Sequence, residues 1–168
     1  EILTEKVNFI STGELLDLLR EVQGNTNLNP IGKNTFVGAY KKIEGTYVDE
    51  EARLPFIIEC WATAKDAPKD SDHHNISVIT NRTPTLGQSQ LGVNSGRPRF
   101  TSAGYYRSHS KQVNRNKSYS VILAISSPFI PIVSAGKMPR LLNGTYGAEI
   151  IDALFSTMKK AGAATTKK

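Results

Sequence analysis

A long amphipathic helix near the C-terminal end constrains the fold more than any other feature of this sequence. The pattern predicts a helix over residues 146–160. Its apolar face is formed by Ile150, Ile151, Leu154, Phe155 and Met158. Acidic residues lie near its start and lysines at its end, which complements the helix dipole. A helix with one apolar face needs a second layer of structure to cover that face.

Three apolar runs supply that second layer. LPFIIECWAT at residues 54–63 reads as a buried strand, and NISVITN at 75–81 alternates as a strand does. A third strand is predicted at 119–126. The sequence therefore predicts a two-layer α/β (α+β) sandwich with one helical face. Between the second and third strands, residues 87–117 predict a long loop, with one short strand near 99–102.

The first part of the chain predicts helices instead. Ser11 and Glu14 fit a capping box, followed by an apolar face that predicts a helix over residues 11–23. Asn29-Pro30 is typical of a second helix start. Its expected buried side is Ile31, Phe36, Val37, Tyr40 and Ile43. We therefore expect a small helical unit at residues 1–45, followed by the α/β domain at 46–168.

The net charge of +6 is unevenly distributed, because residues 73–148 contain no Asp or Glu. An acid-free basic stretch attracts phosphate groups. The candidate nucleic-acid-binding residues are Arg97, Arg99, Arg107, Lys111, Arg115 and Lys117. They are interleaved with Phe100, Tyr105 and Tyr106, whose rings could stack on bases. The alternative is a solvated basic loop whose aromatic residues pin it to the sheet.

Cysteine and membrane signals are sparse. Cys60 is the single cysteine, so no disulfide within the chain is possible, and its apolar surroundings predict a core residue. The apolar stretches are too short to span a bilayer, and no signal peptide is visible, so we expect an intracellular protein without membrane contact. His73-His74 lacks further spaced ligands, and we predict no metal site. Because the first residue is Glu1, we expect a piece of a longer protein.

A lone lysine closes the last apolar run. The third strand continues through Ser-Pro-Phe-Ile-Pro and stops at Ser134-Ala135-Gly136-Lys137. Ser134 and Ala135 permit close approach, and Gly136 permits a tight turn. An ammonium group presented on such a turn suits a phosphate oxygen. A solvated turn lysine is the other interpretation that the residues leave open.

Three stretches in this order resemble the ATP-binding, B-type protein of DNA topoisomerase VI. They are Asn27-Leu28-Asn29-Pro30-Ile31-Gly32; the strand at 54–59 followed by Asn81-Arg82-Thr83-Pro84; and the last strand leading to Ser134-Ala135-Gly136-Lys137. The resemblance is to the transducer domain of that protein, of the βαβ type, and to the helix–two-turns–helix unit before it. It covers roughly residues 11–160. Met138 and Pro139 stand where that family usually has an acidic residue after its lysine.

The resemblance implies a relay function in a GHKL ATPase. Lys137 would be the switch lysine, with Ser134 and Gly136 beside it, sensing the γ-phosphate of ATP. ATP with Mg²⁺ would be bound mainly by an upstream ATPase domain, through which the protein would dimerise. The partner would be the A-like subunit that cleaves DNA, and this chain alone is not expected to be catalytic. A stand-alone basic nucleic-acid-binding module and an assembly domain that docks a partner through helix 146–160 are the alternatives.

Overall fold

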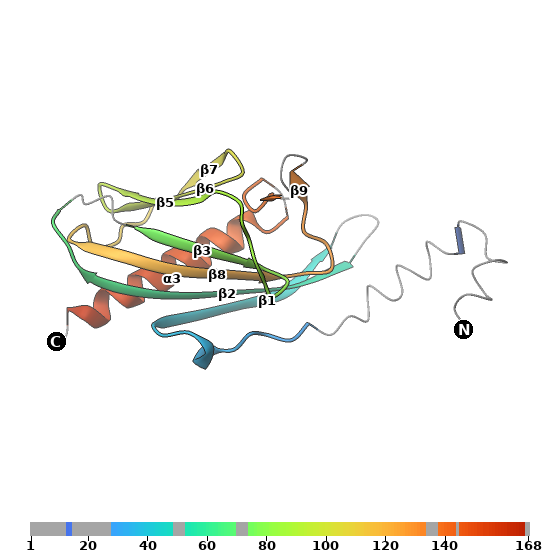
Figure 1. Cartoon of the computed structure of the whole chain (residues 1–168), viewed down its shortest axis with the longest axis horizontal. Coiled ribbons are helices and arrows are strands. Elements are labelled where there is room, and N and C mark those ends of the chain that lie inside the picture. The colour runs from blue at the N-terminus through green and yellow to red at the C-terminus, as the bar shows by residue number, and fades with distance from the viewer. Residues whose placement is uncertain are drawn as a thin grey trace.

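The main sheet combines antiparallel and parallel strands. The computed structural model describes residues 13–14, 28–48, 53–69, 74–133, 138–143 and 145–166. The sheet strands are β1 (Ala39–Val48), β2 (Arg53–Asp66), β8 (Lys117–Ser126), β3 (Asn75–Thr80) and β4 (Thr83–Pro84), in that spatial order. Strand β3 runs parallel to β8, and the other neighbours are antiparallel (Figure 1). The three predicted strands are confirmed as β2, β3 and β8.

A β-meander forms the crossover between the parallel strands β3 and β8. It consists of β5 (Ser89–Asn94), β6 (Arg97–Ser102) and β7 (Tyr105–Ser108). The prediction of a long loop at 87–117 is therefore wrong, although the short strand expected at 99–102 lies within β6. Two parallel strands need a long connection, which is usually a helix, as in a βαβ unit. In this protein three short strands form that connection.

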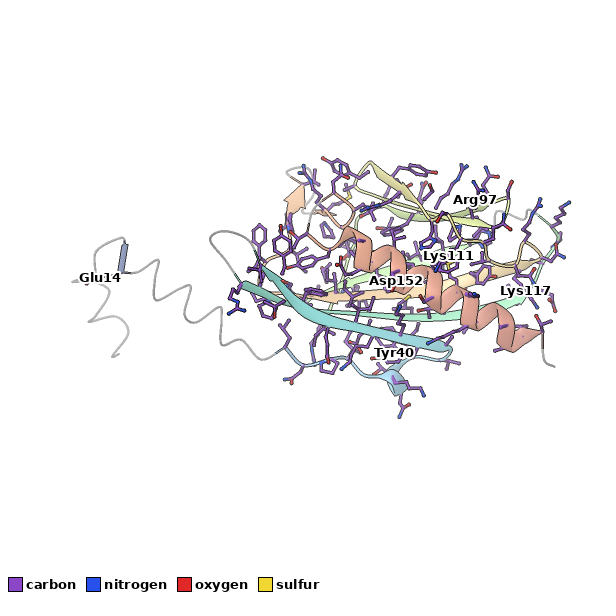
Figure 2. All side chains as sticks on the ribbon, turned by 180° about the vertical axis from the view of Figure 1, so that it is seen from behind. Glu14, Tyr40, Arg97, Lys111, Lys117 and Asp152 are labelled. Atoms are coloured by element: carbon purple, nitrogen blue, oxygen red, sulfur yellow. The ribbon has the colours of Figure 1, made fainter. Side chains whose placement is uncertain are left out.

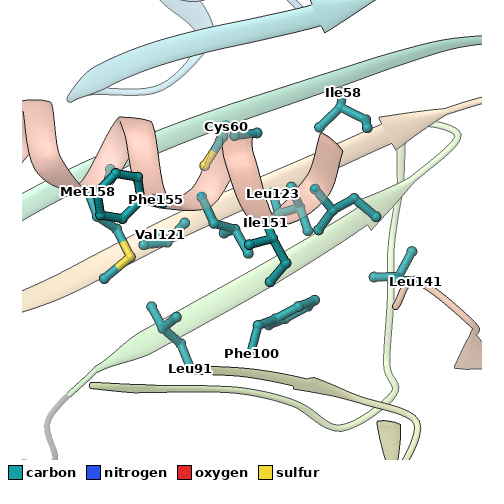
Figure 3. Close-up of a cluster of buried hydrophobic side chains, with 14 of the residues drawn as sticks. Ile58, Cys60, Leu91, Phe100, Val121, Leu123, Leu141, Ile151, Phe155 and Met158 are labelled. Carbon is teal, nitrogen blue, oxygen red and sulfur yellow. The ribbon is translucent and has the colours of Figure 1, made fainter. Parts of the chain in front are cut away.

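The predicted C-terminal helix is confirmed as α3 (Gly147–Thr165), which lies along one face of the main sheet (Figure 1). Its five predicted apolar residues are all buried. Figure 3 shows the core that they form with side chains of β2, β8 and the meander, including Ile58, Cys60, Leu91, Phe100 and Leu123. The fold is thus the two-layer α/β sandwich that the sequence predicts, and Cys60 is a core residue.

The prediction of a second helix that begins at Asn29-Pro30 is wrong. Its residues form a short 3-10 helix, η1 (Lys33–Thr35), and then β1, which pairs with β2 along its length. Gly38, with φ 128°, fixes this path, because a Cβ atom there would clash with the carbonyl oxygen of Ala62. The expected boundary between residues 45 and 46 falls inside β1.

The first predicted helix, at residues 11–23, lies outside the described residues apart from Gly13 and Glu14, which are helical.

Short strands β9 (Ile132–Val133) and β10 (Met138–Pro139) form a separate pair. Within the described ranges, no helix has the length and apolar character needed to cross a bilayer.

Candidate functional site

The predicted switch residues Ser134, Gly136 and Lys137 lie outside the described residues, but both of their flanks are described. Ile132–Val133 pairs antiparallel with Met138–Pro139, and the amide of Arg140 donates to the Pro131 carbonyl at 2.6 Å. These bonds fix the two ends of the 134–137 segment next to each other. Figure 1 shows β9 near the end of the sheet at which β3 and β8 finish.

A hollow of about 610 Å³ opens beside this strand pair. It is lined by Thr80, Asn81, Pro128, Phe129, Ile130, Pro131, Ile132 and Pro139. Phe129 and Ile132 are 53% and 63% exposed, so the rim is apolar. None of these lining residues is cationic. The described part of the hollow therefore suits apolar side chains better than a triphosphate.

Hydrogen bonds connect the start of the Ser-Pro-Phe-Ile-Pro segment to helix α3. The Ser127 amide donates to Asn81 Oδ1 at 3.0 Å, and the Ser127 hydroxyl lies 2.8 Å from the Tyr146 hydroxyl. Both Ser127 and Tyr146 are buried, and burial raises the pKa of Tyr146. Tyr146 is the N-cap residue of α3 and packs against the ring of Phe56 at 5.0 Å. The segment that leads to Lys137 is thus fixed to the helix start.

Glu59 is a site residue that the sequence reasoning missed. It is 2% exposed and accepts hydrogen bonds from the amides of Ile31 and Gly32, at 2.6 and 2.9 Å. The Tyr40 hydroxyl donates a third bond at 2.7 Å, and burial together with this bond raises the pKa of Tyr40. Glu and Asp side chains are almost never fully buried unless they are paired. A glutamate in the middle of FIIECW was therefore an available signal of a polar contact there.

Arg82 lies in the turn between β3 and β4. Its Nη2 donates to the carbonyl oxygens of Asn29 and Pro30, at 3.2 and 3.3 Å. Trp61 contributes to the same segment, because its Nε1 donates to the Lys33 carbonyl at 3.1 Å. We call residues 29–36, which these bonds hold on the sheet face opposite α3, the strap.

The candidate nucleic-acid-binding residues do not all come together. Arg97 and Arg99 alternate with buried residues on β6, so both project from the outer face of the meander. The Arg99 guanidinium lies over the Tyr106 ring, 5.9 Å from its centroid. Arg115 lies at the same end of the meander, because its side chain packs closely against Gly96 in the turn before β6. This cluster of Arg97, Arg99, Arg115 and Tyr106 is the basic surface.

Arg107 and Lys111 lie elsewhere, beside α3. Arg107 is directly opposite the buried Phe100, and its guanidinium lies close to Gly147, the first residue of the helix. Figure 2 shows Lys111 beside α3. Its Nζ is 5.8 Å from the centroid of the Phe155 ring. Both side chains therefore face a different surface from Arg97.

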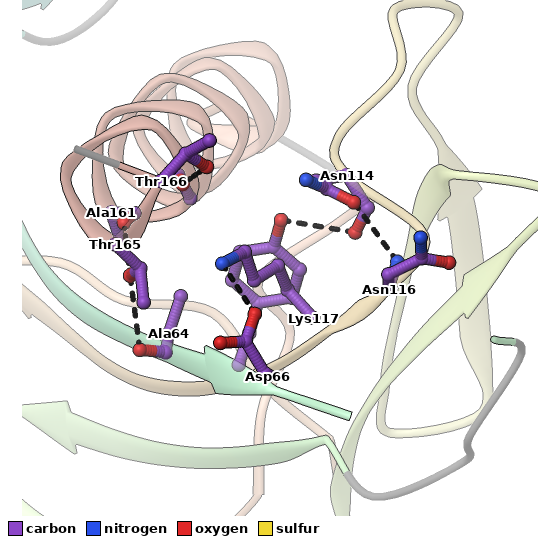
Figure 4. A network of polar contacts seen from close by, with 10 residues as sticks. Ala64, Asp66, Asn114, Asn116, Lys117, Ala161, Thr165 and Thr166 are labelled. Carbon is purple, nitrogen blue, oxygen red and sulfur yellow. Dashed lines mark hydrogen bonds and ion pairs between the residues drawn. The ribbon is translucent and has the colours of Figure 1, made fainter. Parts of the chain in front are cut away.

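Lys117 has a structural role. Its side chain is 5% exposed, and Nζ is 2.6 Å from Asp66 Oδ1 (Figure 4). The neighbouring Tyr119 hydroxyl donates to the Asn114 carbonyl at 3.2 Å. A lysine that is buried against a carboxylate is poorly placed to bind a phosphate in solution.

The described ranges contain no group of three or more His, Cys, Asp or Glu side chains that could hold a metal ion. Burial raises the pKa of the Cys60 thiol to about 12, so the thiolate form that acts as a nucleophile is disfavoured. What the described residues do offer is a braced strand pair, a strap and a basic surface.

No family model matches this chain, and no curated protein is significantly similar to it. The assignments that follow therefore rest on the residues and contacts described above.

Proposed function

We propose that this chain is the transducer region of an ATPase that resembles the B-type protein of topoisomerase VI. In this proposal Lys137 senses the γ-phosphate of ATP, and the α/β domain relays that state to a DNA-cleaving A-like partner. The observation that supports it most is that the segment leading to β9 is hydrogen-bonded, through Ser127, to Tyr146 at the start of α3. A displacement of the 134–137 segment would act on Ser127, and through Tyr146 on the start of the helix.

Only one group of this chain would reach the nucleotide. The described lining of the hollow is uncharged and mostly apolar, so Lys137 would supply the positive charge, with Ser134 and Gly136 allowing close approach. ATP with Mg²⁺ would be held by the upstream domain, which would also form the homodimer. The γ-phosphate would provide a negative charge that attracts and orders the lysine. This chain contributes the sensor and the relay rather than the catalytic base.

The full-length protein tests this proposal through ATP turnover. We expect Lys137→Ala to lower turnover at least about tenfold, which corresponds to the loss of one charge-assisted contact. Lys159→Ala, at an exposed lysine on α3, is the matched control and should keep wild-type turnover. Circular dichroism would verify that both variants fold. Wild-type turnover in Lys137→Ala would reject the switch role.

A second candidate function is nucleic-acid binding by the basic surface. The observation that favours it is Arg97 and Arg99 on one exposed face with the Tyr106 ring, which is 56% exposed. Guanidinium groups bind phosphates, and an exposed ring can stack on a base of a single strand. The third interpretation, partner docking through α3, loses support because the apolar face of the helix is buried against its own sheets.

Salt-dependent binding of a single-stranded oligonucleotide tests this second function. Replacing both Arg97 and Arg99 with Ala should reduce the slope of log K against log salt by about 1.4, if each contacts one phosphate. Arg53→Ala, at an exposed residue of β2, is the control. Equal slopes for the double variant and the wild type would exclude the basic surface as the binding site.

A further inference from the structure

Three hairpins in the described part of the chain use the same tight turn. In each turn two residues connect directly paired strand ends, and both residues have positive φ, as in a type I′ turn. The turns are Asn81-Arg82 (φ 46° and 64°), Ser95-Gly96 (50° and 75°) and Ala103-Gly104 (51° and 79°). The second position of the first turn differs from that of the other two.

Glycine occupies that second position in two turns, and arginine occupies it in the third. Glycine adopts positive φ without a steric penalty, whereas a long side chain does so at a cost. Asparagine tolerates this conformation, so Asn81 needs no special explanation. Arg82 does, because backbone strain persists only where the surroundings impose it, and such strain often marks a functional position.

The contacts of Arg82 provide the explanation. Its guanidinium holds the carbonyl groups of Asn29 and Pro30, at the start of the strap. The next two residues of the strap, Ile31 and Gly32, donate to the buried carboxylate of Glu59. The Arg82 side chain and one buried carboxylate therefore fix four consecutive residues of the strap.

The other residue of the turn holds a different part of the chain. Asn81 Oδ1 accepts a hydrogen bond from Ser127, and the Asn81 amide donates to the Ile125 carbonyl at 2.9 Å. Ser127 in turn contacts Tyr146 at the start of α3. Two adjacent residues thus hold the strap and the segment leading to β9.

We infer that the Asn81-Arg82 turn is a strained junction that keeps the strap in register with the Ser127 segment. Arg82 is a positioning residue in this junction, and its side chain offsets the strain of its backbone. The chain that enters the domain through the strap then moves together with the segment between β8 and β9. This inference goes beyond the proposed function, because it needs neither ATP nor a partner.

The Ala103-Gly104 turn, which has the same type, provides the reference for a stability measurement on Arg82. At Gly104 a Cβ atom would meet nothing within 4 Å, so Gly104→Arg measures the cost of arginine in this turn without new contacts. If the Arg82 side chain had no role, Arg82→Gly would raise the denaturation midpoint as much as Gly104→Arg lowers it. We expect Arg82→Gly to leave the midpoint unchanged or lower it. A gain equal to the Gly104→Arg loss overturns the inference.

Amide hydrogen exchange of the full chain gives the second readout. Arg82→Gly should speed exchange at Ile31 and Gly32 about tenfold, because the strap opens more often when one anchor is lost. It should also speed exchange at Ser127, since the junction joins both segments. Ala103→Gly relaxes a turn of the same type away from the strap and should change none of these rates. Wild-type rates at Ile31 and Gly32 in Arg82→Gly also overturn the inference.

Discussion

The two faces of strand β2 are both buried, but by different means. Alternate residues Phe56, Ile58, Cys60 and Ala62 face α3 and belong to the apolar core. On the opposite face, Glu59 and Trp61 are 2% and 1% exposed, and both form hydrogen bonds to the strap. Apolar side chains shield one face of β2 from water, and a short segment held by polar contacts shields the other.

The difference indicates where the domain can move. Apolar packing is non-directional and is spread over many side chains, so the α3 face should open only with global unfolding. The strap depends on a few directional bonds to Glu59, Trp61 and Arg82, so it can open locally. The proposed relay role needs one rigid face and one adjustable contact, and β2 carries both.

The largest expected effect lies on the helix face. Leu123→Ala should lower the free energy of unfolding by about 2–5 kcal/mol, because Leu123 is fully buried in the core beneath α3. Chemical denaturation measures this loss, and amide exchange should rise over the whole sheet. Ser120→Ala, at an exposed position of the same strand, should change stability by less than about 0.5 kcal/mol. A loss limited to α3 would contradict a single cooperative core.

A smaller and more local effect is expected on the strap face. Glu59→Gln should cost about 1–3 kcal/mol, because the charged acceptor of two amides and one hydroxyl is replaced by a neutral one. Trp61 is the single tryptophan of the chain and lies 5.0 Å from the Phe36 ring, so its fluorescence reports the strap directly. Its emission should shift to longer wavelength before global unfolding begins.

Glu44→Gln provides the matched carboxylate change on β1. Glu44 is exposed and pairs with Lys42 at 2.7 Å, and an exposed ion pair contributes about 0–1 kcal/mol. The Trp61 emission should not respond to this substitution. Equal costs for the two glutamates would show that the strap face has no special anchor at Glu59.

The sequence predicts well the face of β2 that packs against α3. The spacing of Leu154, Phe155 and Met158 indicates an amphipathic helix, and the three apolar runs indicate the sheet that covers it. These signals are strong because burial of one face imposes a regular period. The fold class and the main core therefore follow from the order and spacing of apolar residues.

The strap face could not be derived in the same way. Both faces of β2 are buried, so FIIECW is nearly uniformly apolar and does not show which residues lie on which side. In the strap and β1, the apolar residues Ile31, Phe36, Tyr40 and Ile43 follow one another at roughly helical spacing. The backbone is not helical there, and Gly32 and Gly38 have positive φ. Contacts distant in sequence, such as that of Glu59 with Ile31, decide this region. Likewise, the side-chain directions of Arg107 and Lys117 depend on strand register, which the composition does not show.

The smallest effect concerns the alkaline behaviour of the strap. The pKa of Tyr40 is raised by burial and by its bond to Glu59, so the folded state holds this proton more tightly than the unfolded state, where the pKa is about 10. The Tyr40 contribution is thus complete below that pH and is lost as the pH rises above it. Tyr40→Phe removes one hydrogen bond and should cost about 0.5–1.5 kcal/mol at neutral pH.

The difference in stability between Tyr40→Phe and the wild type should therefore shrink as the pH rises above about 10. Denaturation curves of both proteins at a series of pH values measure this difference, and titrations shared by both proteins cancel in it. Trp61 emission should follow the same trend, since the Tyr40 and Trp61 rings lie 5.2 Å apart. A difference that stays constant across this pH range would mean that the Tyr40 hydroxyl does not hold Glu59 in place. The strap would then depend on the backbone amides and on Arg82.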